Sequence, residues 1–109
     1  MFKMEEDVLI AEFMNHLQHG NLVVIDNIPV HIENAKYHSS WDWLMLVVEK
    51  IESLGFTVFM LTHCIYIQSK KEGVIVAPKY TDIEGSKIES TYVAVVEFIK
   101  WRKENLTNL

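Results

Sequence analysis

The segment from Tyr37 to Gly55, YHSSWDWLMLVVEKIESLG, constrains the fold more than any other part of the chain. Ser39 is followed three residues later by Asp42, which resembles a capping box, and Gly55 is a typical helix stop. Apolar residues recur between these signals at helical spacing. The segment therefore predicts an amphipathic helix over 40–54, with this buried stripe: Trp41, Leu44, Met45, Val48 and Ile51.

Two further segments have helical character. Apolar residues at helical spacing, with three acidic residues in the first turn, predict a helix over 5–19 that ends at Gly20. Ser86 and Glu89 form an S-x-x-E capping box ahead of another apolar stripe, which predicts a helix over 87–103.

Residues 56–69 change to a period of two and are rich in β-branched and aromatic side chains, as expected of strands. The run is too long for one ordinary strand, so we expect a hairpin that turns at Thr62–His63. One long bent strand is the alternative, because neither turn residue favours a positive φ. In the hairpin, four side chains would share the face toward the helices: Val58, Met60, Ile65 and Ile67.

Two other regions have weaker strand character. Residues 74–77 predict a short strand that ends at Pro78, and residues 22–33 predict either a weak hairpin or an irregular β segment with Pro29 at an edge. The expected fold is a single α+β domain over 1–109, in which a small antiparallel sheet packs against three helices. Its elements are the hairpin 56–69, the strand 74–77 and helices over 5–19, 40–54 and 87–103.

The composition of the chain indicates which classes of partner are disfavoured and which cellular compartment is expected. The chain has a net charge of −5 and no basic stripe, which argues against nucleic acid as a partner. Mimicry of nucleic acid is also disfavoured, because the charge density is low. A single cysteine, Cys64, allows no intramolecular disulfide and fits a reducing compartment. The sequence has neither a signal-peptide pattern nor an apolar run of about 20 residues, so we expect a cytoplasmic protein without a membrane partner.

One group of residues has a spacing suited to metal ligation. Glu12, His16 and His19 fall at i, i+4 and i+7 of the expected first helix, so that they could present three ligands to zinc. The alternative is a solvated helix face, since the H-E-x-x-H pattern of zinc enzymes is absent.

A second group contains the residue types of a hydrolase triad: His38, Ser39, Ser40 and Asp42. Triad members must converge in space, whereas these residues crowd one helix start and lack the glycine-rich turn of a nucleophile elbow. Cys64 lies in an apolar run and is expected to behave as a small hydrophobic residue. We therefore assign no catalytic residue, expect no cofactor, and favour a protein that is not an enzyme.

Apolar side chains outside the predicted stripes suggest a surface that binds a partner. Trp43 and Leu46 point away from the stripe of the second helix, and Trp101 lies off the main face of the third. Tryptophan is enriched at interface hot spots, so these three residues are candidates for binding a protein partner or a second copy of the chain. Alternatively, the tryptophans wrap around the helix edges and pack within the domain.

The segments YHSSWDWLMLVVEKIE and KIESTYVAVVEFIKW resemble those of a family of short uncharacterised proteins from gut bacteria and their phages. The resemblance covers 37–54 and 87–101, and Leu46 stands where many relatives have proline. It implies a phage or mobile-element context and no particular activity. The off-stripe Trp43, Leu46 and Trp101, together with the lack of a catalytic site, predict a protein-interaction module that can associate with itself. The alternative is a small metal-binding protein or enzyme that uses Glu12, His16 and His19, or one centred on His38.

Overall fold

The computed structural model describes residues 4–18, 22–25, 28–61, 64–80 and 87–107. Its helices and strands confirm the α+β class. In chain order they are α1 (Met4–Phe13), β1 (Leu17–Gln18), β2 (Leu22–Ile25), β3 (Ile28–His31), the 3-10 helix η1 (Ile32–Asn34), α2 (Trp41–Ser53), β4 (Phe56–Met60), β5 (Cys64–Ser69), β6 (Gly73–Tyr80) and α3 (Lys87–Thr107).

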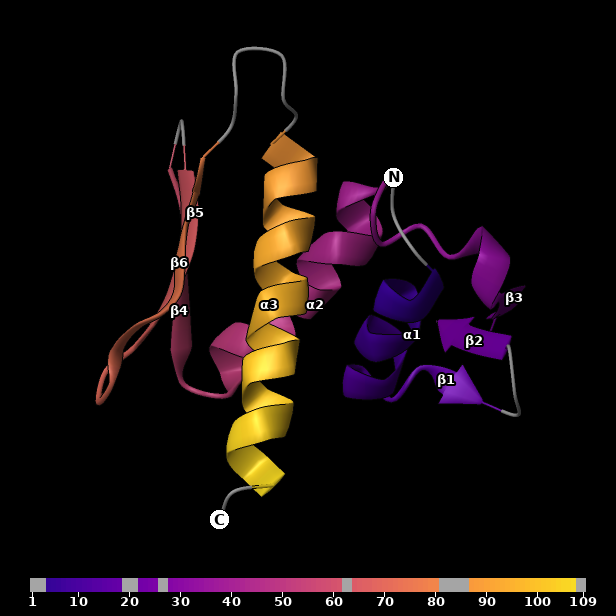
Figure 1. Cartoon of the computed structure of the whole chain (residues 1–109). Coiled ribbons are helices and arrows are strands. Elements are labelled where there is room, and N and C mark those ends of the chain that lie inside the picture. The colour runs from indigo at the N-terminus through magenta and orange to yellow at the C-terminus, as the bar shows by residue number, and fades with distance from the viewer. Residues whose placement is uncertain (1–3, 19–21, 26–27, 62–63, 81–86, 108–109) are drawn as a thin grey trace.

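The helices lie between two small sheets (Figure 1). The sheet of β4, β5 and β6 forms one side of the molecule, and α2 and α3 pack against it. On the other side of α3 lies α1, followed by the sheet of β1, β2 and β3. The hydrophobic core is continuous from one sheet to the other, because buried residues of both sheets belong to one cluster with those of the helices.

The larger sheet is antiparallel in the order β4-β5-β6. Val58 lies opposite Ile67 and Met60 opposite Ile65, which confirms the hairpin and excludes one bent strand. Three of these four side chains are buried and Met60 is half-buried, as the alternation predicted. The turn residues Thr62–His63 lie outside the described residues.

The strand predicted over 74–77 is longer than expected, since β6 extends from Gly73 to Tyr80 and contains Pro78. The expectation that Pro78 ends this strand was wrong. A proline cannot donate to a ladder, but β6 is an edge strand. Its pairing with β5 is also irregular, with register shifts between Ile65 and Ile67 and after Ile67. Such bulges tolerate a residue that cannot pair.

The first helix is shorter than the predicted range 5–19, because it ends at Phe13. Asn15 adopts a left-handed conformation with φ 59°. The amide of His16 donates to the Ala11 carbonyl at 2.9 Å, which is the six-to-one bond of a Schellman motif. Asparagine therefore ends the helix where the apolar spacing alone suggested that it continued.

The region after α1 forms the smaller sheet, in the order β1-β2-β3. The segment over 22–33 is therefore a hairpin extended by β1, and Val23 on the central strand is fully buried. Pro29 lies on the edge strand β3, as predicted. The expected stop at Gly20 lies outside the described residues.

Helix α2 agrees with the prediction to within a residue at each end, and Gly55 follows it with φ 98°. Its N-cap is Ser40 rather than Ser39, and the Ser40 side chain makes no capping hydrogen bond. Trp41 is 38% exposed, so its assignment to the buried stripe was wrong. The buried face is instead formed by Leu44, Val47, Val48 and Ile51.

Helix α3 extends four residues beyond the predicted end at 103, to Thr107. The Asn105 side chain donates to the Trp101 carbonyl at 2.8 Å, which supports the additional turn. The helix contributes the largest part of the core, since Tyr92, Phe98 and Ile99 are almost fully buried. Ser86 of the predicted capping box lies outside the described residues.

Candidate functional site

The predicted metal site does not form on one helix face. Glu12 lies on α1, with its carboxylate 3.6 Å from the Lys103 ammonium. His16 follows the helix end, where its Nδ1 and the Tyr37 hydroxyl share a hydrogen bond of 2.8 Å. His19 lies outside the described residues. The assumption of one continuous helix through these three residues was wrong, and within the described ranges no three His, Cys, Asp or Glu side chains are grouped to hold a metal ion.

The two tryptophans of the predicted partner surface pack within the domain, which favours the alternative interpretation. Trp43 is half-buried and meets Tyr37 edge to face, with ring centroids 5.1 Å apart. Trp101 packs in the same way on Phe56, at 5.9 Å. Leu46 is the most exposed of the three candidates, at 38%. Trp43 and Trp101 thus bury most of their surface within the domain, as the alternative interpretation expected.

A polar cluster joins α1, α3 and the segment before α2. Asp7 is only 6% exposed, and the fully buried Tyr92 donates its hydroxyl to the Asp7 carboxylate at 2.9 Å. His38 Nδ1 lies 3.8 Å from the other carboxylate oxygen. The His38 ring also meets the Tyr92 ring edge to face, at 6.2 Å. Asp7 is thus the point at which three parts of the chain meet.

Burial dominates the electrostatics of this cluster. It raises the pKa of Asp7, although the hydrogen bond from Tyr92 and the proximity of His38 both lower it. Burial raises the pKa of Tyr92 and of Tyr37 as well, and the negative charge of Asp7 adds to both shifts. Both phenols therefore keep their protons at neutral pH, and Tyr92 remains a hydrogen-bond donor.

The cluster has the residue types of acid–base chemistry, but three of its four side chains lack the access that a substrate needs. Asp7, Tyr37 and Tyr92 are buried, and the His38 side chain is 33% exposed. A general acid or base must come within hydrogen-bond reach of the substrate. Asp7 is the acidic group that lies 3.8 Å from His38, whereas the triad considered from the sequence paired His38 with Asp42. We therefore interpret the cluster as a polar contact that joins α1 to the rest of the fold.

The larger sheet has a face that none of the described helices covers. Because side chains alternate along a strand, the residues between the buried positions point away from α2 and α3. We call this the outer face and define it by six residues: Thr57, Phe59, Cys64, Tyr66, Gln68 and Val74. In Figure 1 the three helices that the structure describes all lie on the other side of this sheet.

The outer face is uncharged and aromatic at its centre. Phe59 and Tyr66 are directly opposite in register, and their rings stack with centroids 4.5 Å apart and planes 10° apart. Val74 at one end is 53% exposed. None of the six defining residues is Asp, Glu, Lys, Arg or His. The alternation over 56–69 predicts two of these strands but indicates no role for the side chains opposite the core.

Comparisons with protein-family models, curated proteins and solved structures find no match to this chain. None of the helices in the described part of the chain combines the length and the apolar character of a membrane span.

Proposed function

We propose that this protein is a non-enzymatic protein-interaction module that self-associates weakly through the outer face of its larger sheet. The observation that carries the proposal is the uncharged face centred on Phe59 and Tyr66, with the helices on the opposite side. The largest exposed apolar patch of a typical monomer covers about 300–600 Å² and is often functional. We therefore place the partner surface on the sheet instead of at Trp43, Leu46 and Trp101.

The aromatic pair makes this face suited to packing against another protein. Stacking leaves the outer ring surfaces of Phe59 and Tyr66 half-exposed in a fixed arrangement. Aromatic side chains bury large areas and are enriched at interfaces, where the tyrosine hydroxyl can stay in contact with water. The rings are already ordered by the strand register, so an interface would require little additional ordering.

A second copy of the chain is the partner that the charges favour. Copies of a chain with net charge −5 repel one another over most of their surfaces. The outer face lacks charges, so two copies can approach there with the least electrostatic cost. A two-fold axis would place each aromatic pair against its equivalent, in the self-complementary geometry of most homodimers.

The size of the face sets the strength of the association. Three strands about 4.8 Å apart and about six residues long cover roughly 300 Å². A stable interface buries about 800 Å² per partner. We therefore expect a transient dimer with a dissociation constant on the order of 100 μM or weaker.

Sedimentation of matched variants tests the proposal. Val74→Lys places a charge on the outer face, whereas Val93→Lys makes the same change at a 40% exposed position of α3. We expect the wild type and Val93→Lys to dimerise as concentration rises to about 1 mM, and Val74→Lys to dimerise at least tenfold more weakly. Circular dichroism confirms that both variants are folded. A wild type that stays monomeric, or two variants that associate equally, would refute the proposal.

We also infer a phage or mobile-element context, which rests on the sequence resemblance alone. The segments that carry it form α2 with the residues before it and the first part of α3. Genes for phage structural or replication proteins beside this gene would support the inference. A position inside a housekeeping operon would argue against it.

A further inference from the structure

A cleft of about 200 Å³ lies between α1 and α3. Each helix contributes three residues at i, i+3 and i+4, which is one flank of a helix. The lining residues are Leu9, Glu12 and Phe13 from α1, and Ile99, Arg102 and Lys103 from α3. None of the lining residues belongs to the outer face or to the polar cluster around Asp7.

The floor of the cleft is apolar and held in place from several sides. Ile99 is 2% exposed, and Phe13 is half-buried. The Phe13 ring meets Phe98 edge to face at 6.0 Å, and the Lys50 ammonium lies 5.0 Å from its centroid. The same ammonium donates to the Phe13 carbonyl at 2.6 Å. The floor therefore exists before any ligand binds, which reduces the entropic cost of binding.

The rim of the cleft is positively charged, although the chain as a whole is acidic. Arg102 and Lys103 come from α3 and Glu12 from α1, which leaves one net positive charge. The Lys103 ammonium is 3.6 Å from the Glu12 carboxylate, so these two charges largely offset each other. Arg102 is half-exposed at the same rim. Its guanidinium offers the paired donors that match a carboxylate.

We propose that this cleft binds a small apolar carboxylate. The hydrocarbon part would displace water from the floor formed by Leu9, Phe13 and Ile99, and the carboxylate would accept hydrogen bonds from Arg102. A water molecule occupies about 30 Å³, so the cleft holds about six or seven waters. An aliphatic acid of about eight non-hydrogen atoms fits this space, and a ligand of that size binds with a dissociation constant on the order of 1 mM.

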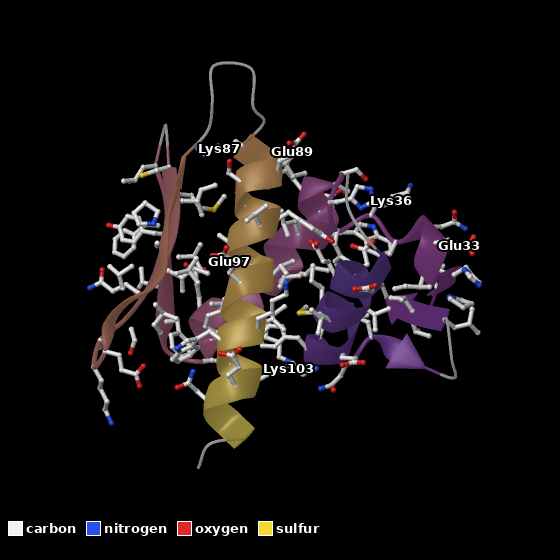
Figure 2. All side chains as sticks on the ribbon, in the orientation of Figure 1. Glu33, Lys36, Lys87, Glu89, Glu97 and Lys103 are labelled. Carbon is white, nitrogen blue, oxygen red and sulfur yellow. The ribbon has the colours of Figure 1, made fainter. Side chains whose placement is uncertain are left out.

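Hexanoate and its neutral isostere hexanamide are the probes, titrated into the ¹⁵N-labelled protein. Binding should shift amide resonances of α1 and α3 around the cleft, and hexanoate should bind at least fivefold more tightly than hexanamide. Arg102→Gln should weaken hexanoate binding about five- to tenfold. Lys87→Gln is the matched control, because it removes the same charge near the opposite end of α3 (Figure 2). It should leave the affinity unchanged.

For a third variant we expect the affinity for hexanoate to change in the opposite direction. Glu12→Gln removes the negative charge at the rim, and with it the ion pair to Lys103, so hexanoate should bind two- to fivefold more tightly. The spectrum of each variant without ligand shows whether it is folded. Equal affinity for hexanoate and hexanamide would overturn the proposal. So would equal losses in Arg102→Gln and Lys87→Gln, or weaker binding by Glu12→Gln.

Discussion

Removal of one hydroxyl group tests whether the buried contact between α1 and α3 stabilises the fold. In Tyr92→Phe the ring remains, but the donor to Asp7, 2.9 Å from the carboxylate, is lost. Asp7 is 6% exposed and Tyr92 is fully buried, so water can replace this donor only in part. The variant therefore leaves a buried carboxylate with one hydrogen bond fewer.

The expected loss follows from the type of hydrogen bond. A hydrogen bond to a charged group contributes about 1.5–3 kcal/mol, and the loss is greater when the remaining group stays buried. We expect Tyr92→Phe to lower the free energy of unfolding by about 2 kcal/mol. For a chain of 109 residues this lowers the midpoint of thermal unfolding by about 8 °C.

Chemical denaturation monitored by circular dichroism measures this loss, and a double-mutant cycle assigns it to the pair. Asp7→Asn keeps an oxygen that can accept from Tyr92 but removes the charge. The double variant Asp7→Asn with Tyr92→Phe should show a coupling energy of about 1 kcal/mol or more. Tyr66→Phe is the control, because this tyrosine is half-exposed on the outer face. It should change stability by less than about 0.5 kcal/mol.

Because the pKa of Asp7 is raised, the free energy of unfolding depends on pH. Burial raises this pKa above its ordinary value of 3.8, so folding favours the protonated carboxyl group. This stabilisation is complete below pH 3.8 and is lost as the pH rises through the pKa of the folded state. Asn at position 7 does not titrate, so Asp7→Asn should gain stability relative to the wild type as the pH rises from 3.8 to 7. Two results would refute the reasoning. One is a loss of unfolding free energy in Tyr92→Phe no larger than in Tyr66→Phe. The other is a stability difference between Asp7→Asn and the wild type that stays constant across this pH range.

Three further predictions concern the fold around α1, each measured by chemical denaturation. Asn15→Gly should be neutral or slightly stabilising, whereas Asn15→Val should cost about 1–2 kcal/mol because φ is 59°; equal effects would contradict the Schellman ending. Phe98→Ala should cost about 3–5 kcal/mol, since this fully buried ring contacts three other aromatic rings, and a loss below 1 kcal/mol would mean that they repack. Lys50→Met keeps the apolar stem but loses the hydrogen bond to the Phe13 carbonyl, which should cost about 1–2 kcal/mol; an unchanged stability would show that water replaces the ammonium.

Local sequence signals correctly predicted the helices and strands whose ends are set by their own residues. Gly55 ends α2 because its φ of 98° suits glycine, and the alternation over 56–69 gave the hairpin its correct inner face. The end of α1 was missed because Asn15 was not considered as a left-handed residue. Asparagine is the second choice for this position after glycine, so the signal was present in the sequence.

The contacts of Trp43 and Asp7 were harder to predict, because they depend on which helices and segments pack together. Trp43 lies off the stripe of α2, but Tyr37 from the preceding segment packs against it. Asp7 has the same helical phase as Ile10 and Ala11, three and four residues later, which are both fully buried. That phase could have indicated burial of the carboxylate. The identity of its partner, 85 positions away, could not be read from the sequence.

The separation of 85 positions between Asp7 and Tyr92 has a consequence while the ribosome synthesises the chain. At about 5–20 residues per second, a ribosome needs roughly 4–17 s to advance from Asp7 to Tyr92. During that interval α1 has none of the surface of α3 to pack on, and a single helix of ten residues is only marginally stable alone. The face of α1 that packs on α3 therefore stays uncovered for several seconds, which is long enough for a chaperone to bind it before α3 docks.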